Sequence, residues 1–576
     1  MTSNAVLGID LGTECSTVAF VGRGPLDGKG VVDVVQDDQS QRRVETLVMF
    51  SDRARSFAHM VRAQMKSNLK NVCRDLKHLL VKGGPAVLST WQLCGVGEGD
   101  DGYPAFQVTH RGTPRQFSAI QVVGMMLGHL KGLGERWAQA PASDVVVSVP
   151  AHFSENDRKA LISAADVAGM SILRVFDEPT AVALSYGFYR VAEFDSQQPT
   201  HVGFVSMGHS TFFAAVVAFT SGGLRVVSVA SDPGCGGRDL DLALMAMMAL
   251  NFRTQHPDLP DPMSNIKARL KMEQEASKLK KTLSANANAT YGIDCLLDGE
   301  DLGGTIERDA FEAACAPIVL PTISRILEDV TSAAASQGVS LEALHSVEMV
   351  GGAMRVPMIQ KHVQDHFKRT LSTTLNADEA VARGCALMAA IQGSSLRRVR
   401  EFVVAEQCPK VTKGALGASM LRRYMREEDQ LAGESRNVRL AEEARNALEA
   451  FMFSMEQGEK RSSLELWLED HVDDDCDVFK DKLKQLREEC GEARAASPIS
   501  PVPRGQQKPA DREPRTAPSS RQNWSRSMAG QGAPIERGSE TRAKSNAAGS
   551  YARSHFGRSW AKGPERSSHL RGRSRN

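Results

Sequence analysis

The sequence predicts an α/β protein built on a duplicated nucleotide-binding fold. An apolar strand at residues 5–10 is followed by a glycine turn and a second apolar strand at residues 17–21. The same layout returns at residues 203–219, about 200 residues along the chain. Glycine and hydroxyl groups bring hydrogen-bond donors close to phosphate oxygens, so each turn is a candidate phosphate loop. The two differ in one respect: Asp10 ends the first strand, whereas Ser206 stands at the matching place in the second.

Composition indicates a folded body and a basic tail. The chain has 576 residues, of which 41% are hydrophobic, enough for several domains and a sizeable core. Residues 501–576 hold 16 Lys and Arg against 5 Asp and Glu, whereas residues 1–500 hold 54 against 64. We therefore expect a mildly acidic body followed by a basic segment.

Cysteine usage and hydropathy indicate a cellular compartment. The ten cysteines are scattered without a C-x-x-C pair, which argues against a zinc site or a disulfide framework and for a reducing compartment. No basic segment precedes the first apolar run, and no stretch supplies the roughly 20 apolar residues of a membrane helix. We expect a cytoplasmic protein without a membrane partner, with the nucleus as the alternative location.

The elements between the two hairpins follow from hydrophobic spacing. A strand is predicted at residues 45–50, helices at residues 56–82 and 115–139, and a buried strand at residues 145–149. A capping box at Ser154 opens the next helix, and a strand follows at residues 172–176. Glu178 then stands at a strand-to-helix junction, where α/β folds place catalytic groups. A first-turn acid that complements the helix dipole explains Glu178 equally well.

Three further segments complete the predicted body. A third glycine turn at residues 232–238 opens a helix that continues to residue 250, and a charged helix covers residues 265–283. A strand at residues 347–350 runs into a double glycine, and a final helix runs from residue 377 to 393. A single glycine turn is weak evidence, but five loops in this order, each at the end of a strand, strongly favour a nucleotide site.

Several motifs resemble the 70-kDa heat-shock proteins, whose ATPase domain has the actin-type fold. The matching stretches are Gly8–Thr13, Val149–Ala151, Asp177–Ala181, Val350–Gly352 and the segment around Asp378. Finer features resemble the 110-kDa branch of that superfamily, namely residues 207–210, 278–281, 283–287, 372–387 and 399–402. The resemblance implies a two-lobed, ribonuclease H-like duplicated domain over residues 1–393.

The resemblance also implies a ligand set and roles for individual residues. ATP or ADP with Mg²⁺ is the expected ligand, and Asp10 is expected to orient the metal through water. Lys77 and Glu178 match the catalytic lysine and glutamate of the family; without the match, Lys77 would be interpreted as a solvated surface charge. Phosphate contacts are expected at Gly12, Thr13, Gly208 and Thr211, and nucleoside contacts at Lys280, Lys281, Ser284, Gly352, Arg355 and Asp378.

Three positions depart from the family pattern. Ser206 and Phe213 stand where ATPase members carry aspartates, and Glu14 stands where a hydroxyl usually meets phosphate. Phosphoryl transfer depends on positioning and charge stabilisation of metal and water, so loss of an acid weakens the metal site. An added carboxylate beside phosphate is repulsive unless a cation compensates it. We therefore expect weak or absent ATP hydrolysis.

The chain also departs from the family after residue 393. Residues 394–437 are predicted to be a linker, because a peptide-binding β-sandwich needs roughly 100 residues. An incomplete gene sequence would also explain why there is no room for the β-sandwich. Residues 438–492 resemble the family's helical lid, with helices at 440–455, at 463–470 and around Phe479, and residues 493–576 are predicted to be a disordered basic tail.

Three functions stay open at this point. The resemblance favours an ATP-binding co-chaperone that speeds nucleotide exchange on a 70-kDa heat-shock chaperone and can also hold unfolded polypeptides. An ATP-hydrolysing chaperone, relying on Asp10, Lys77 and Glu178, is the second function, and a degenerate scaffold without nucleotide is the third. Nucleic acid is an expected partner only through basic residues such as Arg571–Arg575.

Overall fold

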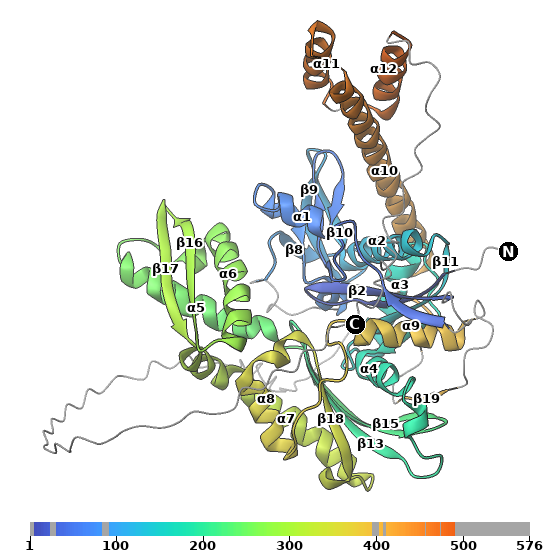
Figure 1. Cartoon of the computed structure of the whole chain (residues 1–576), viewed down its shortest axis with the longest axis vertical. Helices are drawn as coiled ribbons and strands as arrows, with labels where there is room; N and C mark the ends of the chain where they lie inside the picture. The colour runs from blue at the N-terminus through green and yellow to red at the C-terminus, as the bar shows by residue number, and fades with distance from the viewer. Residues whose placement is uncertain are drawn as a thin grey trace, which may run out of the picture. The chain divides into compact units, whose positions relative to one another are not determined.

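Two mixed β-sheets of similar layout carry the fold in the computed structural model (Figure 1). The structure describes residues 5–23, 30–82, 91–393, 402–406, 411–455, 457–472 and 474–489. The predicted tail over residues 493–576 and part of the branch motif, residues 399–401, lie outside these ranges.

The sheet of the first lobe is organised around the predicted N-terminal hairpin. Its main strands are β1 (Ala5–Asp10), β2 (Cys15–Arg23), β3 (Gly30–Val34), β11 (Ala142–Val149) and β12 (Arg174–Asp177), and the short β4 (Val44–Glu45) pairs with β2. β1 is antiparallel to β2 and parallel to β11, which is parallel to β12. β1 is covered on both faces, which explains its continuous apolar run.

The sheet of the second lobe repeats this layout. Its strands are β13 (Thr200–Met207), β14 (Phe212–Thr220), β15 (Gly223–Asp232), β18 (Leu344–Val350) and β19 (Val403–Ala405). β13 is antiparallel to β14 and parallel to β18, as β1 is to β2 and β11. The repetition confirms the predicted duplicated α/β fold.

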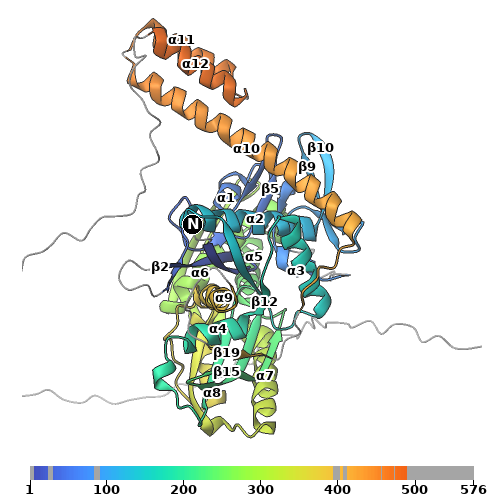
Figure 2. The same cartoon turned by 90° about the vertical axis from the view of Figure 1, so that its right-hand side faces the viewer.

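Two helices lie between the sheets, α4 (Glu178–Gly187) and α9 (Ala380–Gln392) (Figures 1 and 2). α9 packs against β1 and against α4 at backbone distance. A Cβ added at Gly8 would lie 2.0 Å from the backbone nitrogen of Ala386, and one added at Gly384 would lie 1.9 Å from the carbonyl oxygen of Ala181. No residue with a side chain fits at either glycine without moving a helix.

Further helices complete the cores of the two lobes. α2 (Ala119–Ala138) and α3 (Glu155–Val167) share the core of the first lobe, and α5 (Gly237–Gln255), α6 (Ile266–Ala285), α7 (Arg308–Ser336) and α8 (Pro357–Phe367) share that of the second. The capping box predicted at Ser154 is confirmed: its hydroxyl accepts from the Asp157 amide, and the Asp157 carboxylate accepts from the Ser154 amide.

Three smaller sheets extend the lobes. Their strands are β5 (Val48–Phe50), β6 (Arg55–Phe57) and β7 (Val72–Cys73); β8 (Gly95–Glu98), β9 (Pro104–His110) and β10 (Thr113–Ser118); and β16 (Asn288–Leu297) and β17 (Glu300–Glu307). The single helix predicted over residues 56–82 is wrong. The segment holds α1 (His59–Gln64) and 3₁₀ turns at residues 69–71 and 76–80. Asp75, with a left-handed φ of 57°, interrupts any continuous helix.

Helix α7 corrects one expectation about hydropathy. By length and composition it is apolar enough to cross a membrane, although the sequence was expected to hold no such stretch. One side of α7, including Phe311, Ile323 and Leu327, is buried in the core of the second lobe. Its apolar composition therefore matches a core helix of a folded domain.

A long helix, α10 (Ala418–Ser454), begins inside the predicted linker, so the expected start near Leu440 is wrong. Its first half packs on the first lobe, where Tyr424 and Leu431 join the core. Polar contacts add to this docking: the Arg55 guanidinium donates to the Glu428 carboxylate at 2.6 Å, and Gln121 donates to Glu427 at 2.6 Å. Because much of this face is polar, hydrophobic spacing did not reveal the helix.

The second half of α10 forms a small helical cluster with α11 (Glu459–Asp470) and α12 (Cys476–Glu489). Its core contains Leu448, Leu464 and Phe479, as the helical spacing predicted. The described residues between 394 and 437 hold β19 and the start of α10. The domain boundaries at 393, 437 and 492 stay predictions.

We expect Glu428→Ala to lower the free energy of unfolding by about 3 kcal/mol, because it leaves a buried guanidinium without its partner. The side chains of Arg55 and Glu428 are only 5% and 12% exposed. Chemical denaturation measures the loss. The matched control is Glu443→Ala, which breaks an exposed pair with Arg439 and should cost less than about 0.5 kcal/mol. Equal effects of the two substitutions would contradict the docking described for α10.

Candidate nucleotide-binding site

A cavity of about 430 Å³ lies where the ends of β1, β13 and β18 meet. All thirteen residues predicted as site residues line it, namely Asp10, Gly12, Thr13, Lys77, Glu178, Gly208, Thr211, Lys280, Lys281, Ser284, Gly352, Arg355 and Asp378. They come from segments spread over more than 360 residues of sequence, and the duplicated fold brings them together. Their individual roles stay predictions.

The acidic end of the cavity is built around Asp10, the last residue of β1. Its carboxylate accepts a hydrogen bond from the Ser148 hydroxyl at 2.8 Å. Nearby, the Lys77 ammonium donates to the Glu178 carboxylate at 2.7 Å, and both side chains are buried. Burial, and then the negative charge of Glu178, raise the pKa of Asp10 to about 6, although Lys77 and the Ser148 hydrogen bond oppose the shift. The two groups predicted to be catalytic are therefore paired and held beside the predicted metal-orienting acid.

The side of the cavity expected to face a metal has a hydroxyl where a second acid was expected. Ser206 lies near the end of β13, opposite Phe213 on β14 and beside Val350 on β18. Phe213 is buried in the core between the lobes. No group of three or more His, Cys, Asp and Glu side chains that could hold a metal ion occurs within the described ranges.

Magnesium still fits this donor set. Mg²⁺ commonly binds one or two carboxylates, substrate phosphates and several waters rather than an all-protein cage. The carboxylate of Asp10 and the hydroxyl of Ser206 both face the cavity. They would hold the ion through water, with most of its ligands supplied by phosphate and solvent.

The opposite end of the cavity carries the predicted nucleoside contacts. The Lys280 ammonium is bound to the Asp241 carboxylate at 2.6 Å and to the Gly237 carbonyl at 2.8 Å. Arg355 faces Asp378 at 3.6 Å, with 61% of its side chain exposed. Sequence reasoning missed the Asp241 partner, which fixes Lys280 against α5. The predicted packing of adenine between Lys281 and Arg355 stays a prediction.

Polar contacts join the two lobes beside the phosphate loops. The Asp75 carboxylate lies 2.5 Å from Nδ1 of His78, whose Nε2 lies 3.3 Å from the Ser210 hydroxyl. Ser210 in turn lies 2.8 Å from the Thr13 hydroxyl. Arg238 of α5 also donates to Asp75, at 3.1 Å. Through this network the positions of the two phosphate loops are linked.

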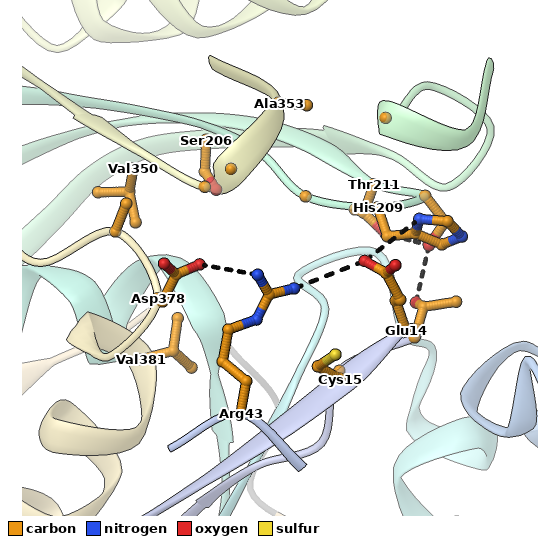
Figure 3. Close-up of a pocket in the computed structure, with 18 of the residues that line it drawn as sticks. Glu14, Cys15, Arg43, Ser206, His209, Thr211, Val350, Ala353, Asp378 and Val381 are labelled. Atoms are coloured by element: carbon orange, nitrogen blue, oxygen red, sulfur yellow. Dashed lines mark hydrogen bonds and ion pairs between the residues drawn. The ribbon is translucent and has the colours of Figure 1, made fainter. Parts of the chain in front are cut away.

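Arg43, which sequence reasoning did not select, points into the cavity between two acids (Figure 3). Its guanidinium lies 3.5 Å from the Glu14 carboxylate and 3.8 Å from the Asp378 carboxylate. The residue stands in an ordinary polar stretch, Gln41-Arg42-Arg43, shortly before the predicted strand at residues 45–50 and without a glycine to mark it. Only the folded chain shows that it belongs to the site.

The fold and the cavity define a class of protein: a two-lobed, actin-like domain in which the glycine turns of two similar hairpins face one cavity. The Hsp70 protein family model matches residues 6–465, so the chain belongs to the Hsp70 family. Domains of this family bind ATP or ADP with Mg²⁺. The resemblance noted in the sequence, including that to the 110-kDa branch, is confirmed.

Three relatives illustrate the similarity. The chain is 34% identical over 409 residues to heat shock 70 kDa protein 16 of Arabidopsis thaliana. It is 35% identical over 411 residues to the 97 kDa heat shock protein of Mesocentrotus franciscanus and 33% identical over 418 residues to human heat shock 70 kDa protein 4L. Each alignment covers 70% of this chain but 52%, 45% and 47% of the respective relative. The chain therefore spans about half the length of the curated relatives it matches.

The raised pKa of Asp10 predicts a pH-dependent stability. The folded state holds the proton up to about pH 6, against a reference value of 3.8, so stability falls as pH rises between these values. Asp10→Asn removes the charge and keeps an acceptor for Ser148. We expect the nucleotide-free variant to be more stable than wild type above pH 6, by about 3 kcal/mol, with the gain vanishing toward pH 4.

Denaturant unfolding across this pH range measures the difference. Asp329→Asn, at an exposed position on α7, is the control and should leave the pH dependence unchanged. An Asp10→Asn variant less stable than wild type at pH 8 would contradict the electrostatic account of this end of the cavity.

Proposed function

We propose that this chain is an ATP-binding regulator of a 70-kDa heat-shock chaperone that accelerates release of ADP from its partner. The observation that carries the proposal is the combination of an assembled nucleotide cavity with a metal side that has lost its acids. All the predicted contact residues line the cavity, yet Ser206 and Phe213 stand where hydrolysing members carry carboxylates. Such a site is suited to bind a nucleotide as a structural ligand rather than to turn it over.

Two further observations support this role. The relatives include heat-shock proteins of the 110-kDa type, which are much longer than this chain. Helix α10 is docked on the first lobe through a buried ion pair and two core residues, and the same continuous helix carries the helical cluster. A closed, nucleotide-loaded body is the shape we propose to dock on the partner.

The proposal has two secondary parts. Holding of unfolded polypeptides is proposed from the similarity to heat-shock relatives. A cytoplasmic location, with the nucleus as the alternative, is proposed from cysteine usage; the cysteines at eight described positions are free thiols. The magnesium ion would be held through water by Asp10, as the donor set allows.

We expect the full chain loaded with Mg-ATP to increase the rate at which a 70-kDa chaperone releases fluorescent ADP by at least about tenfold. Stopped-flow fluorescence with excess unlabelled ATP measures this rate. The Arg355→Ala chain, which loses a predicted nucleoside contact, should accelerate release less at limiting ATP and recover as ATP is raised. If the wild-type chain loaded with Mg-ATP leaves the rate of ADP release from the 70-kDa chaperone unchanged, the proposed function is wrong.

A further inference from the structure

Arg43 and Glu14 flank the same short pairing of two strands. Strand β4 pairs with the start of β2 in a register that matches Glu45 with Cys15. The amide of Thr46 also donates to the carbonyl of Glu14 at 2.9 Å. Glu14 directly precedes β2 and Arg43 directly precedes β4, so in this antiparallel register they lie at opposite ends of the pairing, and their long side chains meet in the cavity (Figure 3).

The carboxylate of Glu14 is ionised at neutral pH. Burial alone would raise its pKa, but nearby cations hold it below its usual range: His209 when it is protonated, and the permanent charges of Arg43, Lys280 and Lys281. Burial lowers the pKa of the His209 imidazole to about 4, so this ring, whose Nδ1 lies 3.8 Å from Glu14, is uncharged at pH 7. Arg43 is then the permanent cation that pairs with the Glu14 carboxylate, at 3.5 Å.

The other groups around Arg43 leave it as the cation that pairs with Glu14. Burial raises the pKa of the neighbouring Cys15 thiol to about 11, so it carries no charge at neutral pH. Asp378 is the second anion that faces Arg43, at 3.8 Å, and it is shared with Arg355 at 3.6 Å. The Lys280 ammonium forms an ion pair with the buried Asp241 carboxylate. Arg43 therefore holds Glu14 on one side and Asp378 on the other.

This arrangement conflicts with phosphate binding at the same loop. Gly12 and Thr13, predicted to contact phosphate, immediately precede Glu14. A carboxylate at that place repels phosphate, whereas a guanidinium binds phosphate through charge-assisted, bidentate hydrogen bonds. About 44% of the Arg43 side chain is exposed, so a ligand in the cavity can reach it. The phosphate chain of a bound nucleotide and the Glu14 carboxylate would then compete for the Arg43 guanidinium.

We propose that Glu14 is a built-in competitor for the phosphate chain of the nucleotide, and that Arg43 is the specificity-determining residue for which the two anions compete. The proposal rests on the proposed nucleotide binding and adds to it a discrimination by charge. A nucleotide must draw Arg43 away from Glu14, and the penalty from Glu14 grows with each phosphate that approaches it. The cleft therefore binds triphosphates more weakly than its other contacts would allow.

The test is calorimetric titration of the full-length chain with adenosine, Mg-ADP and Mg-ATP at fixed ionic strength. For Glu14→Gln we expect Mg-ATP affinity to rise about tenfold, Mg-ADP affinity to rise less, and adenosine affinity to stay unchanged. For Arg43→Gln we expect Mg-ATP affinity to fall about tenfold, with adenosine again unchanged. Dependence on ligand charge separates this role from a structural one, which would affect all three ligands alike.

Matched substitutions control for removal of a charge elsewhere. Glu155→Gln removes an exposed acid on α3, and Arg253→Gln removes an exposed arginine on α5; neither lines the cavity. Both should leave the ratio of ATP to adenosine affinity at the wild-type value.

The outcomes separate this proposal from the proposed function. If wild type binds ATP, and Glu14→Gln and Arg43→Gln keep its ratio of ATP affinity to adenosine affinity, the proposed competition is wrong but nucleotide binding is supported. If neither wild type nor Glu14→Gln binds any of the three ligands, the competition and the proposed function are both wrong. Binding of ATP by Glu14→Gln but not by wild type supports the competition and removes the proposed function of the natural chain.

Discussion

The close packing of α9 against β1 and α4 is the constraint on which the rest of the structure depends. It relies on two glycines, because a side chain at Gly8 or Gly384 would overlap the backbone of the neighbouring helix. The three elements joined there carry acids at their cavity ends: Asp10 ends β1, Glu178 begins α4, and Asp378 shortly precedes α9. The positions of these acids therefore depend on two close backbone contacts, that of α9 with β1 and that of α9 with α4.

The distribution of charge around these fixed acids determines what the cleft can do. The Lys77–Glu178 pair and Asp10, the groups predicted to serve hydrolysis, all line the cavity. Ser206 and Phe213 remove negative charge from the side expected to face metal, and Glu14 adds negative charge beside the predicted phosphate contacts. Both changes act against efficient phosphoryl transfer, because that reaction depends on metal and water held in place by charge. Neither change removes the surface that would bind the nucleoside.

Much of the fold and the site could be predicted from the sequence because their signals are local. The hairpins β1–β2 and β13–β14 are apolar runs around glycine turns, and every predicted site residue lies at or near a strand end, glycine turn or helix carried by a family motif. The helix over residues 56–82 was wrong because basic, amphipathic spacing hid the left-handed Asp75. Arg43, the Asp241 partner of Lys280 and the docking of α10 could not be predicted. Each is a polar pairing between distant segments, and polar pairs leave no periodic pattern in a sequence.

The most direct test of the central claim, that the cleft holds a nucleoside triphosphate without efficiently hydrolysing it, is phosphate release from the full chain under saturating Mg-ATP. Bound nucleotide is quantified in the same samples, and Ser206→Asp is measured in parallel. The account predicts stoichiometric ATP binding by wild type with little phosphate released, and faster release by Ser206→Asp. Rapid release by wild type that Ser206→Asp leaves unchanged, or a wild-type cleft that binds no ATP, would contradict it.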